Sequence, residues 1–261
     1  GNFSNGDGRL LNLGNPAALD WVINHVDRML TEQGIDYYRQ DFNISPLRLW
    51  RAADAADREG ITENLYVQGY LAYWDALIAR HPGLIIDSCA SGGRRNDLET
   101  MRRAVPLLRS DYLFEPASQQ NHHAAYAAWI PYHGGGYAVG VSSIGFKLSP
   151  GIDPYEFRSN MCPSINLCYD VRRTDLDYAL ARQLFNQQRQ VGPAYFGDFY
   201  PLTSYSLAQD VWMAWQYDRP EASSGIVQAF RRPESGAEAT RYRLRGLDPA
   251  ASYRVTDLDH P

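Results

Sequence analysis

The chain has 261 residues, with 25 Lys plus Arg against 30 Asp plus Glu and a formal net charge of −5. At about 100–200 residues per domain, this length allows one large domain, or one and a half. The mildly acidic balance, without any basic block, argues against a nucleic acid or an anionic membrane as a partner. The sequence has no run of 18 apolar residues, so no transmembrane helix is predicted.

The sequence has three cysteines, Cys89, Cys162 and Cys168, and such a low and odd number does not predict a disulfide framework. Cys162 and Cys168 have poor spacing for zinc, so we expect core positions for them. The adjacent His122 and His123 are expected in a loop, where they are solvated or form local hydrogen bonds, rather than on a metal. The chain begins with Gly1 and shows no signal-peptide pattern, which leaves its compartment open.

Helices and strands alternate along most of the chain. Asn15 as N-cap, Pro16 at the first helical position and Gly34 as C-cap predict a helix between them. Periodicity predicts further helices over 64–80, 97–105 and 175–190. Short apolar or aromatic runs predict strands over 35–42, 84–87 and 106–111. This alternation predicts a parallel α/β sheet or barrel, in which the carboxyl ends of the strands carry the active site.

The predicted secondary structure changes after about residue 205. Short strands are expected over 211–217, 226–231, 242–244 and 253–255, with turn-rich stretches between them. We therefore predict two domains, an α/β domain over 1–205 and an antiparallel β domain over 206–261 that is incomplete.

Two aspartates, Asp41 and Asp111, close two of the predicted strands. Glycoside hydrolysis needs such a pair, one carboxylate for the anomeric carbon and one for the departing oxygen. An aspartate at a strand end is also a common helix cap or loop ligand. The pattern alone therefore leaves both interpretations open.

Five segments, in order, resemble glycoside hydrolase family 36, the α-galactosidase family. Residues 37–43 (YYRQDFN) are similar to its nucleophile motif Lys-Trp-Asp-Met-Asn, and residues 86–97 (IDSCASGGRRND) to its Cys-x-x-Gly-Gly-x-Arg-x-Asp loop. Residues 108–111 (LRSD) are similar to its Trp-x-Ser-Asp acid/base segment. Residues 11–16 (LNLGNP) and 148–160 resemble its Leu-Asp-x-Gly-Asn-Pro and late barrel segments. The resemblance extends over about residues 11–205.

The resemblance implies a partial TIM (β/α)8 barrel, about strands 4–8, followed by an antiparallel β-sandwich-like domain. Asp41 would be the nucleophile and Asp111 the general acid/base of a retaining hydrolase, with their carboxyls about 5–5.5 Å apart. No metal or cofactor is implied, and the partner would be an α-galactoside oligosaccharide or glycoconjugate. A homo-oligomer of the full-length protein is allowed. The implied substrate-binding residues are Arg39, Asn43, Cys89, Gly92, Gly93 and Arg95.

Arg95 is expected to brace its loop rather than to touch the substrate. Arg39 stands where the family usually has Lys, so a planar fork replaces a point donor. Gln40 replaces the usual Trp, Arg94 adds bulk and charge to a Gly-rich run, and Tyr112 follows Asp111 where another polar residue is common. These departures leave the sugar open, with galactose, N-acetylgalactosamine and a charged or oligomeric galactoside as candidates.

Two further alternatives remain: galactosyl transfer, as in raffinose-synthase relatives, and a non-catalytic carbohydrate-binding remnant. Among the tryptophans, Trp74 lies on the apolar stripe of a predicted helix and is expected in the core. Trp50 and Trp129 are candidates for stacking on a sugar ring. Because Asp41 would close the fourth barrel strand, we also expect an exposed apolar sheet edge and a half-built pocket in this chain.

Overall fold

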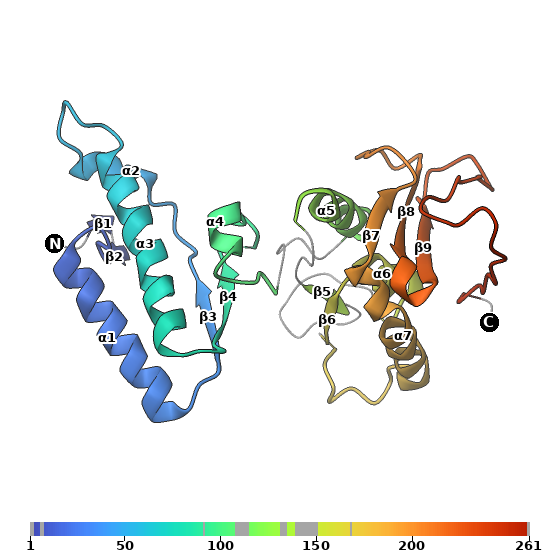
Figure 1. Ribbon diagram of the computed structural model, residues 1–261, viewed down its shortest axis with the longest axis horizontal. Helices are drawn as coiled ribbons and strands as arrows, with labels where there is room; N and C mark the ends of the chain where they lie inside the picture. The colour runs from blue at the N-terminus through green and yellow to red at the C-terminus, as the bar shows by residue number, and fades with distance from the viewer. Residues whose placement is uncertain are drawn as a thin grey trace. The chain divides into compact units, whose positions relative to one another are not determined.

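The computed structural model (Figure 1) describes residues 3–5, 8–90, 92–107, 115–130, 135–138, 151–167 and 169–259. The chain divides into two compact units, Gly1–Pro106 and Leu107–Pro261. Among the described residues, no helix combines the length and the apolar character that crossing a membrane requires.

The first unit begins with a short antiparallel hairpin, β1 (Phe3–Asn5) and β2 (Gly8–Leu10). Helix α1 (Pro16–Gln33) follows as predicted: the Asn15 side chain accepts from the Ala17 N–H, and Gly34 ends the helix in the left-handed conformation with φ 63°. The predicted helix over 64–80 is also confirmed, as α3 (Ile61–Arg80). Between them lies α2 (Leu47–Ala53), which the sequence pattern did not indicate.

Two predicted strands form a parallel pair in this unit. Strand β3 (Tyr37–Asp41) pairs with β4 (Ile85–Cys89), so that Arg39 lies beside Asp87 and Asp41 beside Cys89. The helix expected over 97–105 is shorter than predicted, because α4 (Leu98–Met101) gives way to extended chain that forms a parallel bridge from Val105 to Asp87. Most of the third expected strand, from residue 108 onward, lies outside the described residues.

The core of the first unit lies between the helices and this parallel pair. Trp74 and Leu77 of α3 are fully buried and pack with Ile86 of β4. Trp74 is thus a core residue, as expected. Gly69 allows α3 to pass close to the segment before α1, since a Cβ at this position would lie 2.0 Å from the Leu13 carbonyl oxygen.

The second unit also contains a parallel strand pair, β5 (Gly135–Ala138) with β6 (Ser164–Leu167). Its helices are α5 (Pro116–Trp129), α6 (Pro154–Asn160) and α7 (Tyr178–Val191), followed by the 3₁₀ helix η1 (Gly192–Phe196). Helix α7 confirms the helix predicted over 175–190, with a start at the Asp177 cap. Cys162 is buried, as expected, while Cys168 lies outside the described residues.

The loop predicted for His122 and His123 is wrong, because both lie on α5. His123 is fully buried: its ring stacks on Trp215 at 4.6 Å, and its Nε2 shares a hydrogen bond of 2.9 Å with the Tyr217 hydroxyl. It is therefore a packed core histidine rather than a solvated one. Around it, Phe157, Leu184 and Met213 complete the core of this unit.

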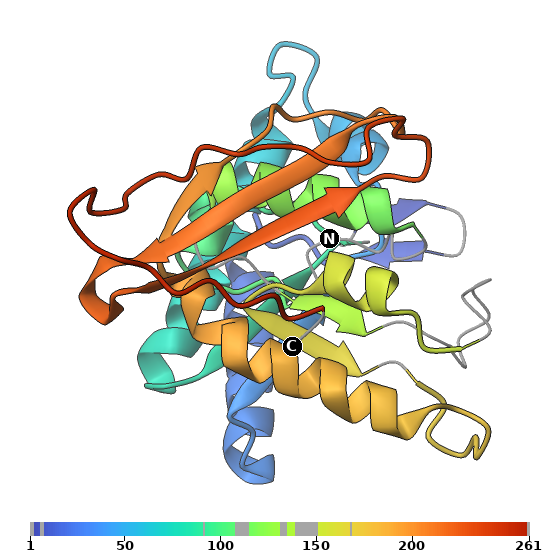
Figure 2. The same cartoon turned by 90° about the vertical axis from the view of Figure 1, so that its right-hand side faces the viewer.

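An antiparallel sheet follows, with the order β7 (Asp198–Pro201), β8 (Trp212–Arg219) and β9 (Ser224–Arg231); the 3₁₀ helix η2 (Pro220–Ala222) joins the last two strands. Figure 2 shows the two long strands side by side. They confirm the strands predicted over 211–217 and 226–231.

The strands predicted over 242–244 and 253–255 are wrong, since both segments are irregular. Tyr253 and Val255 are exposed, so neither gains the half-buried surface that makes aromatic and β-branched residues favour strands. The chain is thus a mixed α/β fold with parallel strand pairs and a small antiparallel sheet. The partial (β/α)8 barrel and the domain boundary at 205 stay predictions.

Candidate active site

The two faces of β3 have different surroundings. Side chains alternate along a strand, so residues 37, 39 and 41 share one face and residues 38 and 40 the other. On the helix-facing side, the Tyr38 hydroxyl lies 2.9 Å from that of Tyr73, and the Trp74 indole N–H donates to Gln40 Oε1 at 2.7 Å. The opposite face therefore presents Arg39 and Asp41.

Three charged groups meet on that opposite face. Asp87, in the middle of β4, is 1% exposed and accepts hydrogen bonds on Oδ2 from the Arg39 guanidinium and, at 2.8 Å, from the Tyr37 hydroxyl. A second guanidinium nitrogen, Nη2 of Arg39, lies 3.9 Å from Asp41 Oδ2. Burial acts against the charged guanidinium, yet the hydrogen bond to Asp87 raises the pKa of Arg39 above its usual value. Arg39 is therefore a permanent cation beside Asp41.

Cys89 ends β4 next to Asp41 and is 6% exposed. Burial, reinforced by the Asp41 carboxylate, raises the pKa of the Cys89 thiol. At neutral pH the group is a protonated thiol, a weak hydrogen-bond donor rather than a thiolate nucleophile. The neighbouring Asp41 side chain is 38% exposed.

A tight loop follows β4. The Ala90 N–H donates to the Gly92 carbonyl at 3.0 Å, and Gly92 is buried with φ 76°, a left-handed conformation that favours glycine. Gly93 forms a bridge with Ala90. The glycines therefore let the backbone turn back at the end of the strand pair, close to Cys89.

Arg95 binds the segment that follows Asp41. Its guanidinium donates to the carbonyls of Phe42 (3.0 Å) and Ile44 (3.2 Å), and its Cζ lies 4.2 Å from the centre of the Phe42 ring. These contacts are those of a bracing residue. Asn43 lies within the braced segment and is exposed.

Asp111, the expected acid/base, lies outside the described residues, as does Ser91 of the loop. The distance between the two carboxyls therefore stays a prediction. The structure does bring Arg39, Asp41, Cys89, Gly92, Gly93 and Arg95 together at the carboxyl ends of β3 and β4.

The sequence interpretation missed Asp87, the acidic partner of Arg39. A signal was present: an aspartate within an otherwise apolar strand is almost never buried unless a cation pairs with it. The expectation for Trp50 is wrong, because its ring is 7% exposed and packs on Tyr66 at 5.2 Å. Trp129 is 83% exposed and remains available for stacking.

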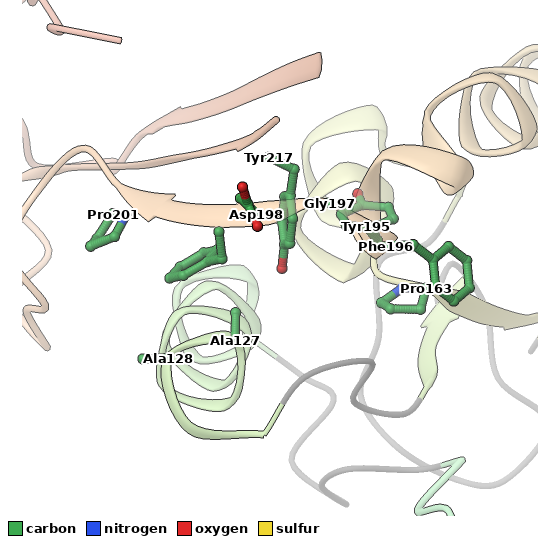
Figure 3. A pocket seen from close by; sticks show the side chains of 10 residues that line it. Ala127, Ala128, Pro163, Tyr195, Phe196, Gly197, Asp198, Pro201 and Tyr217 are labelled. Atoms are coloured by element: carbon green, nitrogen blue, oxygen red, sulfur yellow. The ribbon is translucent and has the colours of Figure 1, made fainter. Parts of the chain in front are cut away.

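The second unit has a cavity of about 510 Å³ beside β7 (Figure 3). It lies between the end of α5 and the segment from Tyr195 to Pro201, and Asp198 and Tyr217 are among its lining residues. Of the predicted site residues that the structure describes, none lines this cavity. In the described ranges, no cluster of three His, Cys, Asp or Glu side chains is arranged to hold a metal ion.

Comparison with known proteins identifies relatives of one kind. The Melibiase family model matches residues 4–118. Alpha-galactosidase Mel36A of Lactobacillus acidophilus is 23% identical over 254 residues, which cover 96% of this chain and 34% of that protein. Alpha-galactosidase AgaA of Geobacillus stearothermophilus is 25% identical over 254 residues, 92% of this chain and 33% of that protein.

Solved structures agree with this fold. The GH36 alpha-galactosidase AgaB of Geobacillus stearothermophilus superposes with a TM-score of 0.77 at 21% identity, covering 94% of this chain and 34% of that one. A variant of AgaA, solved in complex with stachyose, gives a TM-score of 0.75 at 20% identity over 94% of this chain and 34% of that one. The chain spans about one third of the length of these relatives.

Proposed function

We propose that this chain, a relative of the GH36 α-galactosidases, carries the nucleophile and part of the sugar pocket of a retaining α-galactosidase-like glycoside hydrolase. The observation that carries the proposal is the end of the β3–β4 pair, where Asp41 lies 3.9 Å from the Arg39 cation and beside the Cys89 thiol. A half-exposed carboxylate with a fixed cation nearby suits a group that must stay ionised and reach a substrate.

The proposed reaction is a double displacement. Asp41 attacks the anomeric carbon while Asp111 gives its proton to the departing oxygen, which leaves a galactosyl ester on Asp41. Asp111, now a carboxylate, then removes a proton from water, and the resulting hydroxide breaks the ester with a second inversion. The two inversions retain the anomeric configuration, and no redox step or metal is needed.

The proposed substrate is a neutral terminal α-galactoside. Solved relatives bind stachyose and raffinose, both of which end in such a sugar. The charge of Arg39 is already matched by Asp87 and Asp41, which favours a neutral hexose over a uronic acid at this end of the pocket. N-acetylgalactosaminides remain a second substrate class, to be compared in the same assay.

The test is hydrolysis of an aryl α-galactoside by the full-length protein and by Asp41→Asn and Asp111→Asn. We expect a loss of about 10³-fold or more for Asp41→Asn, and about 10²–10⁴-fold for Asp111→Asn. Asp75→Asn is the matched control, because Asp75 lies on the surface of α3 and forms an ion pair of 2.7 Å with Arg103. Wild-type rates in both site variants would refute the proposal.

Azide separates the two roles. In Asp41→Ala, azide attacks the sugar directly and should give the β-galactosyl azide; in Asp111→Ala, it attacks the glycosyl–enzyme and should give the α-anomer. Product analysis at high acceptor concentration separates hydrolysis from galactosyl transfer, since only a transferase makes longer oligosaccharides. Sugar binding without turnover by the full-length protein would instead favour a non-catalytic remnant.

A further inference from the structure

We infer that Asp87 is a positioning residue, which holds the Arg39 guanidinium so that it faces Asp41 without bonding to it. The inference rests on the proposed function and names a residue that controls its nucleophile. Asp87 lies one strand away from Asp41 and touches neither the sugar nor the reacting atoms in this assignment. It acts through Arg39.

Asp87 binds only one of the two terminal nitrogens of the Arg39 guanidinium. Strand register places Asp87 directly beside Arg39, and Asp87 Oδ2 accepts from Nη1 of the guanidinium. The Tyr37 hydroxyl donates to the same oxygen at 2.8 Å and limits the freedom of the carboxylate. The other terminal nitrogen, Nη2, is thereby left on the side of Asp41, 3.9 Å from Oδ2.

The burial of Asp87 supports a specific role. A carboxylate that is 1% exposed is costly unless a cation and hydrogen bonds compensate it, and a neutral side chain would fit a buried strand at lower cost. The guanidinium is planar and carries two terminal nitrogens, so it can bind Asp87 with one and face Asp41 with the other. A lysine, with its single ammonium, would have to divide one point charge between the two.

The distance of 3.9 Å has a chemical consequence. It exceeds the limit of a hydrogen bond, so the Arg39 cation lies near Asp41 without occupying a lone pair of its carboxylate. If Asp87 released the guanidinium, Arg39 could close on Asp41 to a charge-assisted hydrogen bond of about 2.7–2.9 Å. That bond would occupy an attacking lone pair and lower the nucleophilicity of Asp41.

The test is Asp87→Asn in the full-length protein, assayed with an aryl α-galactoside. Asparagine keeps the shape and an acceptor for Tyr37 but removes the charge that holds Arg39. We expect kcat to fall about 10–100-fold, as small misplacements near a reacting group do, while KM changes by less than about twofold, since Arg39 remains in the pocket. Asp75→Asn, which alters an ion pair on the surface of α3, should leave both constants unchanged.

A double-variant cycle shows whether Asp87 acts through Arg39. Arg39→Gln removes the cation yet keeps an amide donor for Asp87. Adding Asp87→Asn to Arg39→Gln should then cause no further loss of kcat, and in the double variant the buried position 87 carries no charge that could prevent folding. Equal losses from Asp87→Asn in both backgrounds would overturn the inference and indicate a structural role.

A wild-type kcat for folded Asp87→Asn would overturn it as well. Failure of the proposed function is a separate result, since it appears as undiminished turnover by Asp41→Asn. The two failures are thus read from different variants of the same protein in one assay.

Discussion

Replacing Arg95 by lysine tests whether this arginine braces the segment that follows Asp41 or binds the proposed sugar substrate. The guanidinium holds the carbonyls of Phe42 and Ile44 and stacks on the Phe42 ring. A lysine keeps the charge but reaches only one carbonyl and loses the planar stacking. The substitution therefore removes part of the brace without removing the cation.

The cost can be worked from these contacts. A hydrogen bond from a charged donor contributes about 1.5–3 kcal/mol, and a partly exposed cation–π contact contributes about 0.5–1 kcal/mol. Losing one such bond and much of the stacking should destabilise the local structure by about 2–3 kcal/mol. Arg102→Lys is the matched control: Arg102 is 71% exposed and pairs with Glu99 on the surface, so its substitution should cost about 0.5 kcal/mol or less.

Native-state hydrogen exchange of the amides of residues 42–45 measures this local free energy. We expect faster exchange there in Arg95→Lys than in Arg102→Lys, together with a fall in kcat, because Asp41 precedes the loosened segment directly. An unchanged exchange rate with an increase confined to KM would refute the bracing role and would place Arg95 on the substrate.

Three further predictions concern the fold. Gly69→Ala should lower the free energy of unfolding by about 2 kcal/mol in chemical denaturation, because a Cβ located 2.0 Å from the Leu13 carbonyl oxygen outweighs a gain of about 1 kcal/mol in helix propensity; a stabilised variant would contradict this. Trp50→Ala should cost about 3–5 kcal/mol in thermal or chemical unfolding and leave KM unchanged, as a core residue does; a raised KM with normal stability would restore its role as a sugar platform. Burial raises the folded-state pKa of a group of tyrosines, so the stability they contribute is fully present below about pH 10 and is lost at higher pH. In a pH titration, the absorbance of their tyrosinate form should therefore appear together with the loss of circular dichroism. Titration of these tyrosines at the ordinary pKa while the protein is still folded would refute this. These tyrosines are Tyr66, Tyr70 and Tyr73.

The elements that could be predicted from the sequence carry their own local signals. Helix α1 was predicted at both ends because its cap residues, Asn15 and Gly34, act through contacts within a few residues. Helix α5 gave no such signal, because its buried face is polar rather than apolar. Gln120 and Asn121 of that face accept hydrogen bonds from Arg232, which is fully buried and lies more than a hundred residues away. Apolar periodicity cannot show a helix that packs through polar groups.

The candidate site could be predicted only in part from the sequence. The resemblance named residues on two strands, and the parallel register brought Asp41 and Cys89 side by side. The partner of Arg39 could not be read from the motif, because cross-strand pairing depends on register rather than on spacing along the chain. Asp87 emerged as that partner only when β3 and β4 were aligned.

Side chains alternate between the two faces of β3, so the departures from the family motif at Arg39 and Gln40 have different consequences for the candidate site. Gln40 faces α3, where its side-chain carbonyl accepts from the indole N–H of the fully buried Trp74, so exchanging the family's usual tryptophan for glutamine changes the packing beneath the strand. Arg39 faces the other way, toward Asp41 and Asp87. Of these two neighbouring departures, only the change from lysine to arginine alters the shape of the cationic group beside Asp41. A difference in sugar preference from the relatives should therefore follow Arg39 and not Gln40.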